Sequence, residues 1–79
     1  MPRGRTPKEP DTSTFVGQIS SEIRRRREKK KLLVVEAATA AGVPAPTWYR
    51  WEQGNGLPLD ALPAIATALG CKPRDLLPK

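Results

Sequence analysis

The stretch of sequence that decides the fold is LLVVEAATAAGVPAPTWYRWEQG, residues 32–54. Small and aliphatic residues from Val34 to Ala41 predict one short helix, and Gly42 marks its end, because glycine adopts positive φ without a Cβ clash. A second helix is predicted from Ala45 to Gln53. The prolines at its start are compatible with a first helical turn, where the N–H that proline lacks would have no intrahelical partner. The stretch therefore predicts two helices joined by a tight turn.

The second of these helices has two chemically different faces. Trp48 and Trp51 lie three residues apart and fall on one face, which we expect to contact the core. The opposite face carries Ala45, Pro46, Tyr49, Arg50 and Gln53. A helix of this length extends about 13.5 Å and fits the major groove of DNA. The pattern favours a helix-turn-helix.

Further residues along the chain match the sequence pattern of a known helix-turn-helix family. In order, they are Arg27, Ala38, Gly42-Val43, Trp51–Gly54, Pro58, Ile65–Gly70 and Pro73–Leu77. With them, the segment from about Val16 to Leu77 resembles the lambda-repressor-like DNA-binding domain, the Cro/cI or XRE type of helix-turn-helix. The resemblance covers roughly four fifths of the chain. It implies an all-α, compact five-helix domain and a sequence-specific DNA-binding transcriptional regulator that acts as a repressor.

Composition divides the chain into a short tail and one domain. Residues 1–13 consist of Pro, Gly, Ser, Thr and charged residues, with Met1 as the one apolar side chain. We therefore expect a flexible, basic N-terminal tail, because such a segment cannot bury enough apolar surface to order itself. Residues 14–79 suffice for a single small core and form the predicted helix-turn-helix domain.

Three further helices are expected around the central pair. The first runs from near Thr14 to near Lys30, with Ser13 or Thr14 as its N-cap. Another spans about 60–69, where Pro63 is expected to delay the first regular turn, and a last short helix spans 73–77. The residues that we expect to face the core are Phe15, Val16, Ile19, Ile23, Leu62, Ile65, Ala66, Leu69, Leu76 and Leu77.

Positive charge is concentrated at the end of the predicted first helix. The net charge is +6, of which residues 14–31 contribute +5, residues 1–13 contribute +1 and residues 32–79 contribute nothing. Such a concentration favours binding to a polyanion, because each neutralised phosphate releases a condensed counterion. The alternative is a solvated helix end whose cations complement the negative C-terminal dipole.

The residue types present exclude several classes of chemistry. The chain has no histidine and one cysteine, Cys71, so we expect no His-based catalysis, no Cys/His zinc site and no internal disulfide. Paired carboxylates, a nucleophile beside a base and a Gly-rich phosphate loop are also missing, so we expect neither enzyme activity nor a cofactor. The longest apolar run is four residues, 32–35, which predicts no membrane span and no signal peptide. A lone thiol fits the reducing cytoplasm expected of a bacterial or phage regulator.

The outer face of the 45–53 helix supplies the candidate base-reading residues. We expect Tyr49 and Arg50 to carry most of the direct readout, with Arg50 either pairing bidentately with guanine O6 and N7 or gripping a phosphate. Ala45, Pro46 and Thr47 are small and mostly apolar, so they offer contacts to thymine methyl groups rather than hydrogen bonds. DNA shape is expected to supply part of the specificity.

Contacts to the DNA backbone are expected from residues around this helix, namely Arg24, Arg27, Val34, Gln53 and Asn55. Val34 would act through the backbone N–H groups of a helix N-terminus. The resemblance further implies an internal ion pair between Arg27 and Glu52. Domains of this family commonly bind roughly palindromic sites as dimers, so double-stranded DNA and a second copy of the chain are the expected partners.

One departure from the family pattern leaves a protein partner open. The family usually starts its second helix with a small polar cap and a glutamine that anchors to the DNA backbone, whereas this chain has Leu33 and Val34 there, followed by Val35. A partly exposed apolar strip of this kind is typical of a protein-binding patch. The alternative function is therefore an antitoxin-like or adaptor module that uses the same fold to hold another protein.

Overall fold

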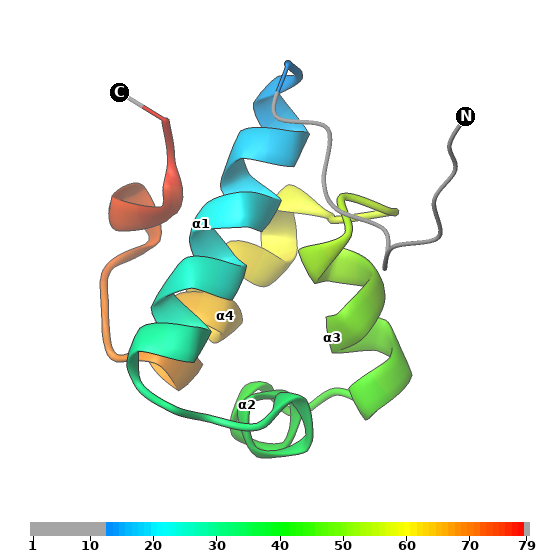
Figure 1. The fold of residues 1–79 in the computed structure, drawn as a ribbon, viewed down its shortest axis with the longest axis vertical. Helices are drawn as coiled ribbons and strands as arrows, with labels where there is room; N and C mark the ends of the chain where they lie inside the picture. The colour runs from blue at the N-terminus through cyan, green and yellow to red at the C-terminus, as the bar shows by residue number, and fades with distance from the viewer. Residues whose placement is uncertain (1–12, 79) are drawn as a thin grey trace, which may run out of the picture.

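The computed structural model describes residues 13–78, which form helices connected by short turns. Four α-helices are present in this range: α1 (Phe15–Lys29), α2 (Val34–Ala41), α3 (Ala45–Glu52) and α4 (Leu62–Leu69). Two 3-10 helices accompany them, η1 (Leu59–Ala61) and η2 (Pro73–Leu76). In Figure 1, α1 lies over α4, α2 is seen nearly end-on, and α3 forms the right-hand edge. The prediction of an all-α helix-turn-helix domain is confirmed, while the predicted tail lies outside the described residues except for Ser13.

One apolar core holds these helices together. Its buried members are Ile19, Ile23, Ala37, Ala38, Trp48, Trp51, Leu62, Ile65, Ala66, Leu69 and Leu76. Trp48 is fully buried, and its ring centroid lies 6.2 Å from that of Trp51. Because α2 packs against α3 and is built mainly from small residues, the bulk of Trp48 compensates for the missing volume at Ala37 and Ala41.

The turn between α2 and α3 follows from its glycine. Gly42 ends α2 in the left-handed conformation, with φ of 78° and ψ of 28°. Its N–H donates to the Thr39 carbonyl at 3.1 Å, and the Val43 N–H donates to the Ala38 carbonyl at 2.9 Å. Pro44 then takes an extended conformation, and α3 begins. This short, hydrogen-bonded connection fixes the direction in which α3 presents its outer face.

The ends of α1 and α4 form as their sequences predict. Thr14 is the N-cap of α1, and its hydroxyl oxygen accepts a hydrogen bond from the Gly17 N–H at 2.9 Å. The segment before α4 starts as the 3-10 helix η1 and becomes α-helical at Leu62, so Pro63 stands at the second position of the α-helix. None of the described helices is long and apolar enough to cross a membrane.

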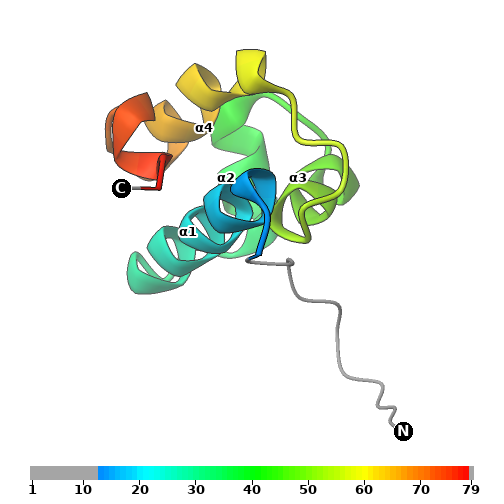
Figure 2. The ribbon, with the colours of Figure 1, turned by 90° about the horizontal axis from the view of Figure 1, so that it is seen from above.

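Two parts of the predicted core are wrong, both at the ends of helices. Phe15 is 55% exposed, because it lies in the first turn of α1, before the first residue that α1 buries, Gly17. The predicted fifth helix is only the 3-10 helix η2, which lies beside α4 (Figure 2), with Leu76 buried and Leu77 38% exposed. The 3-10 helix ends at Leu76, and Leu77 follows it in an extended conformation, so the helix turns Leu76 but not Leu77 toward α4.

Candidate nucleic-acid interface

Helix α3 turns its two faces to different environments. Trp48, Trp51 and Glu52 are buried against the core. Three of the predicted base-reading residues, Pro46, Tyr49 and Arg50, are exposed. The other two, Ala45 and Thr47, are half-buried, as is the predicted phosphate contact Gln53. The buried side of α3 therefore leaves Pro46, Tyr49 and Arg50 on the solvent side, at the spacing of one helical stripe.

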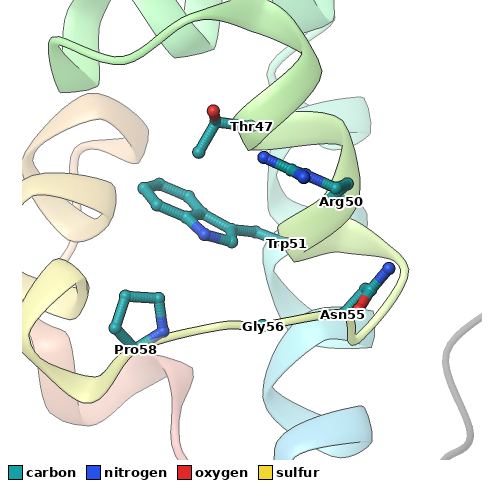
Figure 3. Close-up of a pocket in the computed structure, with 6 residues that line it drawn as sticks. All are labelled: Thr47, Arg50, Trp51, Asn55, Gly56 and Pro58. Atoms are coloured by element: carbon teal, nitrogen blue, oxygen red, sulfur yellow. The ribbon is translucent and has the colours of Figure 1, made fainter.

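A surface hollow lies beside this stripe, between α3 and the segment that leads to η1. Its volume is about 400 Å³, and its lining residues are Thr47, Arg50, Trp51, Asn55, Gly56 and Pro58. Figure 3 shows the Arg50 side chain extending toward Thr47, with the Trp51 ring between Thr47 and Pro58. The Asn55 N–H donates to the Arg50 carbonyl at 2.9 Å, so the backbone itself ties these two residues together. A predicted base reader and a predicted phosphate contact thus share one open depression.

The structure brings Arg27 of α1 and Glu52 of α3 together. Arg27 Nε donates to Glu52 Oε2 at 2.5 Å, and Nη2 donates to Oε1 at 3.1 Å. The two side chains are only 13% and 5% exposed. Arg27 Nη1 also donates to the Leu32 carbonyl at 2.7 Å. Because the guanidinium binds these internal groups, Arg27 joins α1, the α1–α2 connection and α3, and the structure gives no support for the phosphate contact that the sequence predicted for it.

Trp48 also binds to this ion pair, a contact that the sequence analysis did not predict. Its indole Nε1 donates to Glu52 Oε2 at 2.6 Å in the interior. Two sequence signals were available: Trp48 and Glu52 are spaced i,i+4 on one helix, and a buried indole N–H usually requires an acceptor. The carboxylate of Glu52 therefore accepts hydrogen bonds from α1 and from its own helix, and the orientation of α3 is fixed by a polar network as well as by packing.

The arginines of α1 are largely neutralised by acids within residues 13–78. Glu22 binds both Arg25, at 2.6 Å, and Arg26, at 2.7 Å. The hydrogen bond from Arg25 is the main cause that lowers the pKa of Glu22 below its ordinary value. Arg24 contacts Glu28 at 3.3 Å across an exposed surface. Because Arg24, Arg25 and Arg26 are bound to these glutamates, less of their positive charge is available to a ligand than four successive arginines would suggest.

The uncompensated charge of α1 lies at its C-terminal end. In the part of the chain that the structure describes, no ion pair forms at the three successive lysines, Lys29, Lys30 and Lys31. All three are exposed. Lys30 and Lys31 lie in the connection between α1 and α2, so this positive charge is close to the α2 N-terminus in sequence.

The N-terminus of α2 is apolar on its surface. Leu33 is 64% exposed and Val35 is 55% exposed, whereas Val34 is half-buried against the core. The Leu33 N–H donates to Glu36 Oε1 at 2.8 Å, so one of the amides at this helix end is bound internally. Val34 can therefore meet a phosphate only through its backbone, and the exposed surface of the 33–35 strip consists of Leu33 and Val35.

Comparison with known proteins is consistent with this architecture. The helix-turn-helix domain family matches residues 18–79. The restriction-modification controller protein C.AhdI from Aeromonas hydrophila is 26% identical, with a TM-score of 0.73, over 80% of this chain and 96% of that chain. The hypothetical transcription factor NHTF from Neisseria is 22% identical, with a TM-score of 0.78, over 92% of this chain and 85% of that chain, a likeness of fold alone.

A further solved structure, FeII HppE, resembles the chain over one part of its length. It is 31% identical, with a TM-score of 0.74, over 82% of this chain but 35% of that chain. None of the curated proteins compared with the chain matches it. The family match spans most of the chain, and the glycine turn and the outward-facing α3 are those of the predicted motif. The chain belongs to the helix-turn-helix domain family, as a DNA-binding transcriptional regulator of the lambda-repressor-like type.

Proposed function

We propose that the protein is a repressor that places α3 in the major groove of a specific operator. The observation that supports this proposal most directly is the orientation of α3. Trp48, Trp51 and Glu52 anchor one side of the helix, and Tyr49 and Arg50 are thereby held on the solvent side. A rigidly held helix can present side chains to base edges without losing much additional conformational freedom on binding.

In this proposal, Arg50 and Tyr49 read base edges, and Ala45, Pro46 and Thr47 contact the groove from the start of the helix. Arg50 offers the bidentate donor pair that matches guanine O6 and N7. The phenol of Tyr49, 47% exposed, can donate to or accept from a base edge. Repression would follow from occupancy, since a bound domain excludes other proteins from the same DNA.

The DNA backbone would be bound on both sides of α3. On one side, Asn55 and Gln53 follow the helix, and Asn55 lines the same hollow as Arg50. On the other side, Arg24, the α2 N-terminus at Val34 and the lysines at the end of α1 supply positive charge and N–H donors. Arg27 contributes indirectly, because it holds the α1–α2 connection through the Leu32 carbonyl.

We propose that the protein binds DNA as a homodimer, in the cytoplasm of a bacterial cell, and has no catalytic function of its own. One copy of α3 covers only a few base pairs, so two copies on a roughly palindromic site would supply the affinity that specific recognition requires. The structural relative C.AhdI is a restriction-modification controller protein, which supports a regulatory role for this chain.

The proposal is tested by selecting bound sites from a random duplex library. The dissociation constant is then measured for the selected duplex and a scrambled duplex of the same composition, at two salt concentrations. We expect the selected duplex to bind at least a thousandfold more tightly, and both affinities to fall steeply with salt because phosphate contacts release counterions. Equal affinity for the two duplexes would contradict sequence-specific regulation.

A second candidate function rests on the exposed 33–35 strip. Leu33 and Val35 are both more than half exposed at a helix end where the family carries polar groups. An antitoxin-like or adaptor module would use this surface to hold another protein. This function replaces the first if the full chain binds neither duplex tightly at low salt, where electrostatic attraction to DNA is strongest.

A further inference from the structure

The first turn of α3 offers few backbone hydrogen-bond donors, and the Thr47 hydroxyl is its one polar side-chain group. Pro44 is the N-cap, and Pro46 stands at the second helical position. Neither has a backbone N–H. The N–H groups of Thr47 and Trp48 both donate to the Pro44 carbonyl, at 3.0 and 3.2 Å. The exposed surface at this end of α3 is therefore formed mainly by the ring of Pro46, because Ala45 is half-buried against the core and Thr47 is half-buried as well.

The major groove presents one apolar group on its base edges. This group is the C5-methyl of thymine, while the other recognition positions there are hydrogen-bond donors or acceptors. A donor or acceptor covered by carbon loses its bond to water without replacement, which is unfavourable. A methyl group covered by carbon gains from the burial of apolar surface.

We infer that the first turn of α3 selects base pairs that carry a C5-methyl group, so that the operator has thymine, or equally 5-methylcytosine, opposite the exposed ring of Pro46. This inference rests on the proposed function and specifies the DNA that the site accepts. It assigns α3 two kinds of readout: methyl recognition at its N-terminal end and hydrogen bonding by Arg50. Pro46 and Arg50 are about one helical turn apart, about 6 Å along the helix axis, so they would contact different base pairs.

The experiment replaces the methyl group in the DNA, so the protein itself is unchanged. Each thymine of the selected operator is replaced in turn by uracil, which keeps the pairing edge and lacks only the methyl group. We expect about a fourfold loss of affinity at each contacted thymine, because burial of one such carbon contributes about 0.8 kcal/mol. At the same position, a G·C pair with 5-methylcytosine should bind more tightly than one with cytosine.

Two variants connect the effect to the first turn of α3. Pro46→Gln replaces the exposed ring with an amide, and it should remove the sensitivity to uracil at one position of the half-site. Ala64→Ser, at an exposed position of α4, is the matched control and should retain the full sensitivity. Circular dichroism melting confirms that both variants are folded.

The outcomes separate this inference from the function on which it rests. If the selected operator binds tightly and no uracil substitution weakens it, methyl recognition is refuted while sequence-specific binding stands. Methyl recognition by this turn is likewise refuted if Pro46→Gln keeps the sensitivity of the parent protein at every thymine. If no duplex binds specifically, the proposed function fails and methyl recognition fails with it.

Discussion

Glu52→Ala should be among the most damaging single substitutions in this domain, because Glu52 accepts hydrogen bonds from two helices. The change removes the acceptor of Arg27 Nε and Nη2 and of the Trp48 indole N–H. A buried charge left without its partner commonly costs about 3–5 kcal/mol. Arg27 retains its bond to the Leu32 carbonyl and is 13% exposed, so we expect the lower end, about 3 kcal/mol.

For a domain of this size, each kcal/mol changes the melting temperature by about 4–8 °C, so the expected decrease is roughly 12–24 °C. Thermal and urea unfolding, followed by circular dichroism, measure it. Glu28→Ala is the matched control, because it also removes one carboxylate that pairs with arginine, with Arg24 at 3.3 Å and with Arg27 at 4.0 Å, but at an exposed position. Its cost should stay below about 1 kcal/mol.

The double variant Arg27→Met with Glu52→Ala tests the reasoning itself. With both charges removed, the stranded charge disappears, so the double variant should recover part of the loss and give a coupling energy above about 1 kcal/mol. Strictly additive losses would refute the claim that the two residues act as a pair. Trp48→Phe removes the indole donor and also leaves a smaller ring in a fully buried position, so it should cost about 1 kcal/mol for the lost hydrogen bond and a further amount for the cavity.

Three further predictions concern the tail, an ion-pair cluster and a glycine. Deletion of residues 1–12 should leave the melting temperature almost unchanged, because Met1 is their one apolar residue. The same deletion should weaken DNA binding and flatten its salt dependence, and unchanged affinity would exclude a DNA-contacting arm. Because Arg25 lowers the pKa of Glu22, Glu22 stabilises the fold above its unfolded-state pKa, and this contribution should be lost as pH falls through the lower, folded-state pKa. Glu22→Gln should abolish that part of the acid-dependent change in urea midpoint, and an identical pH profile for parent and variant would contradict it. Gly70→Ala should lower the melting temperature, because its Cβ would lie 2.7 Å from the Lys30 ammonium at a φ of +71°; an unchanged melting temperature would show that Lys30 moves away freely and that the strain is negligible.

The sequence predicted the helix-turn-helix well because its boundaries depend on local chemistry. Gly42 and the following prolines mark the end of α2 and the start of α3, and these signals act over two or three residues. The inward residues of α4 were predicted correctly for a similar reason, since a regular helical period repeats over its length. The prediction that Phe15 and Leu77 face the core was wrong, because periodicity does not show where a core ends.

The candidate site was predictable in position and less so in chemistry. The outward placement of Tyr49 and Arg50 follows from helical spacing. The spacing of Glu22 from Arg25 and Arg26, i,i+3 and i,i+4, also indicates their ion pairs, and these pairs change the surface charge. The bond from Arg27 to the Leu32 carbonyl depends on a long side chain reaching a backbone oxygen. No sequence pattern specifies such a contact. The sequence therefore suggested both an ion pair and a phosphate contact for Arg27, and only the structure shows that Glu52 and the Leu32 carbonyl together bind its guanidinium.

The measurement that tests the central claim most directly compares Arg50→Ala with Arg24→Ala on the selected and the scrambled duplex at two salt concentrations. Arg50 lies on the solvent side of α3, whereas Arg24 lies on α1, in an exposed pair with Glu28. Arg50→Ala should cost about 1–3 kcal/mol on the selected duplex and much less on the scrambled one. Arg24→Ala should weaken both duplexes alike and reduce the salt slope by about one unit. If Arg50→Ala weakens both duplexes equally, Arg50 is a phosphate contact, and the claim that it reads bases from the major groove is contradicted.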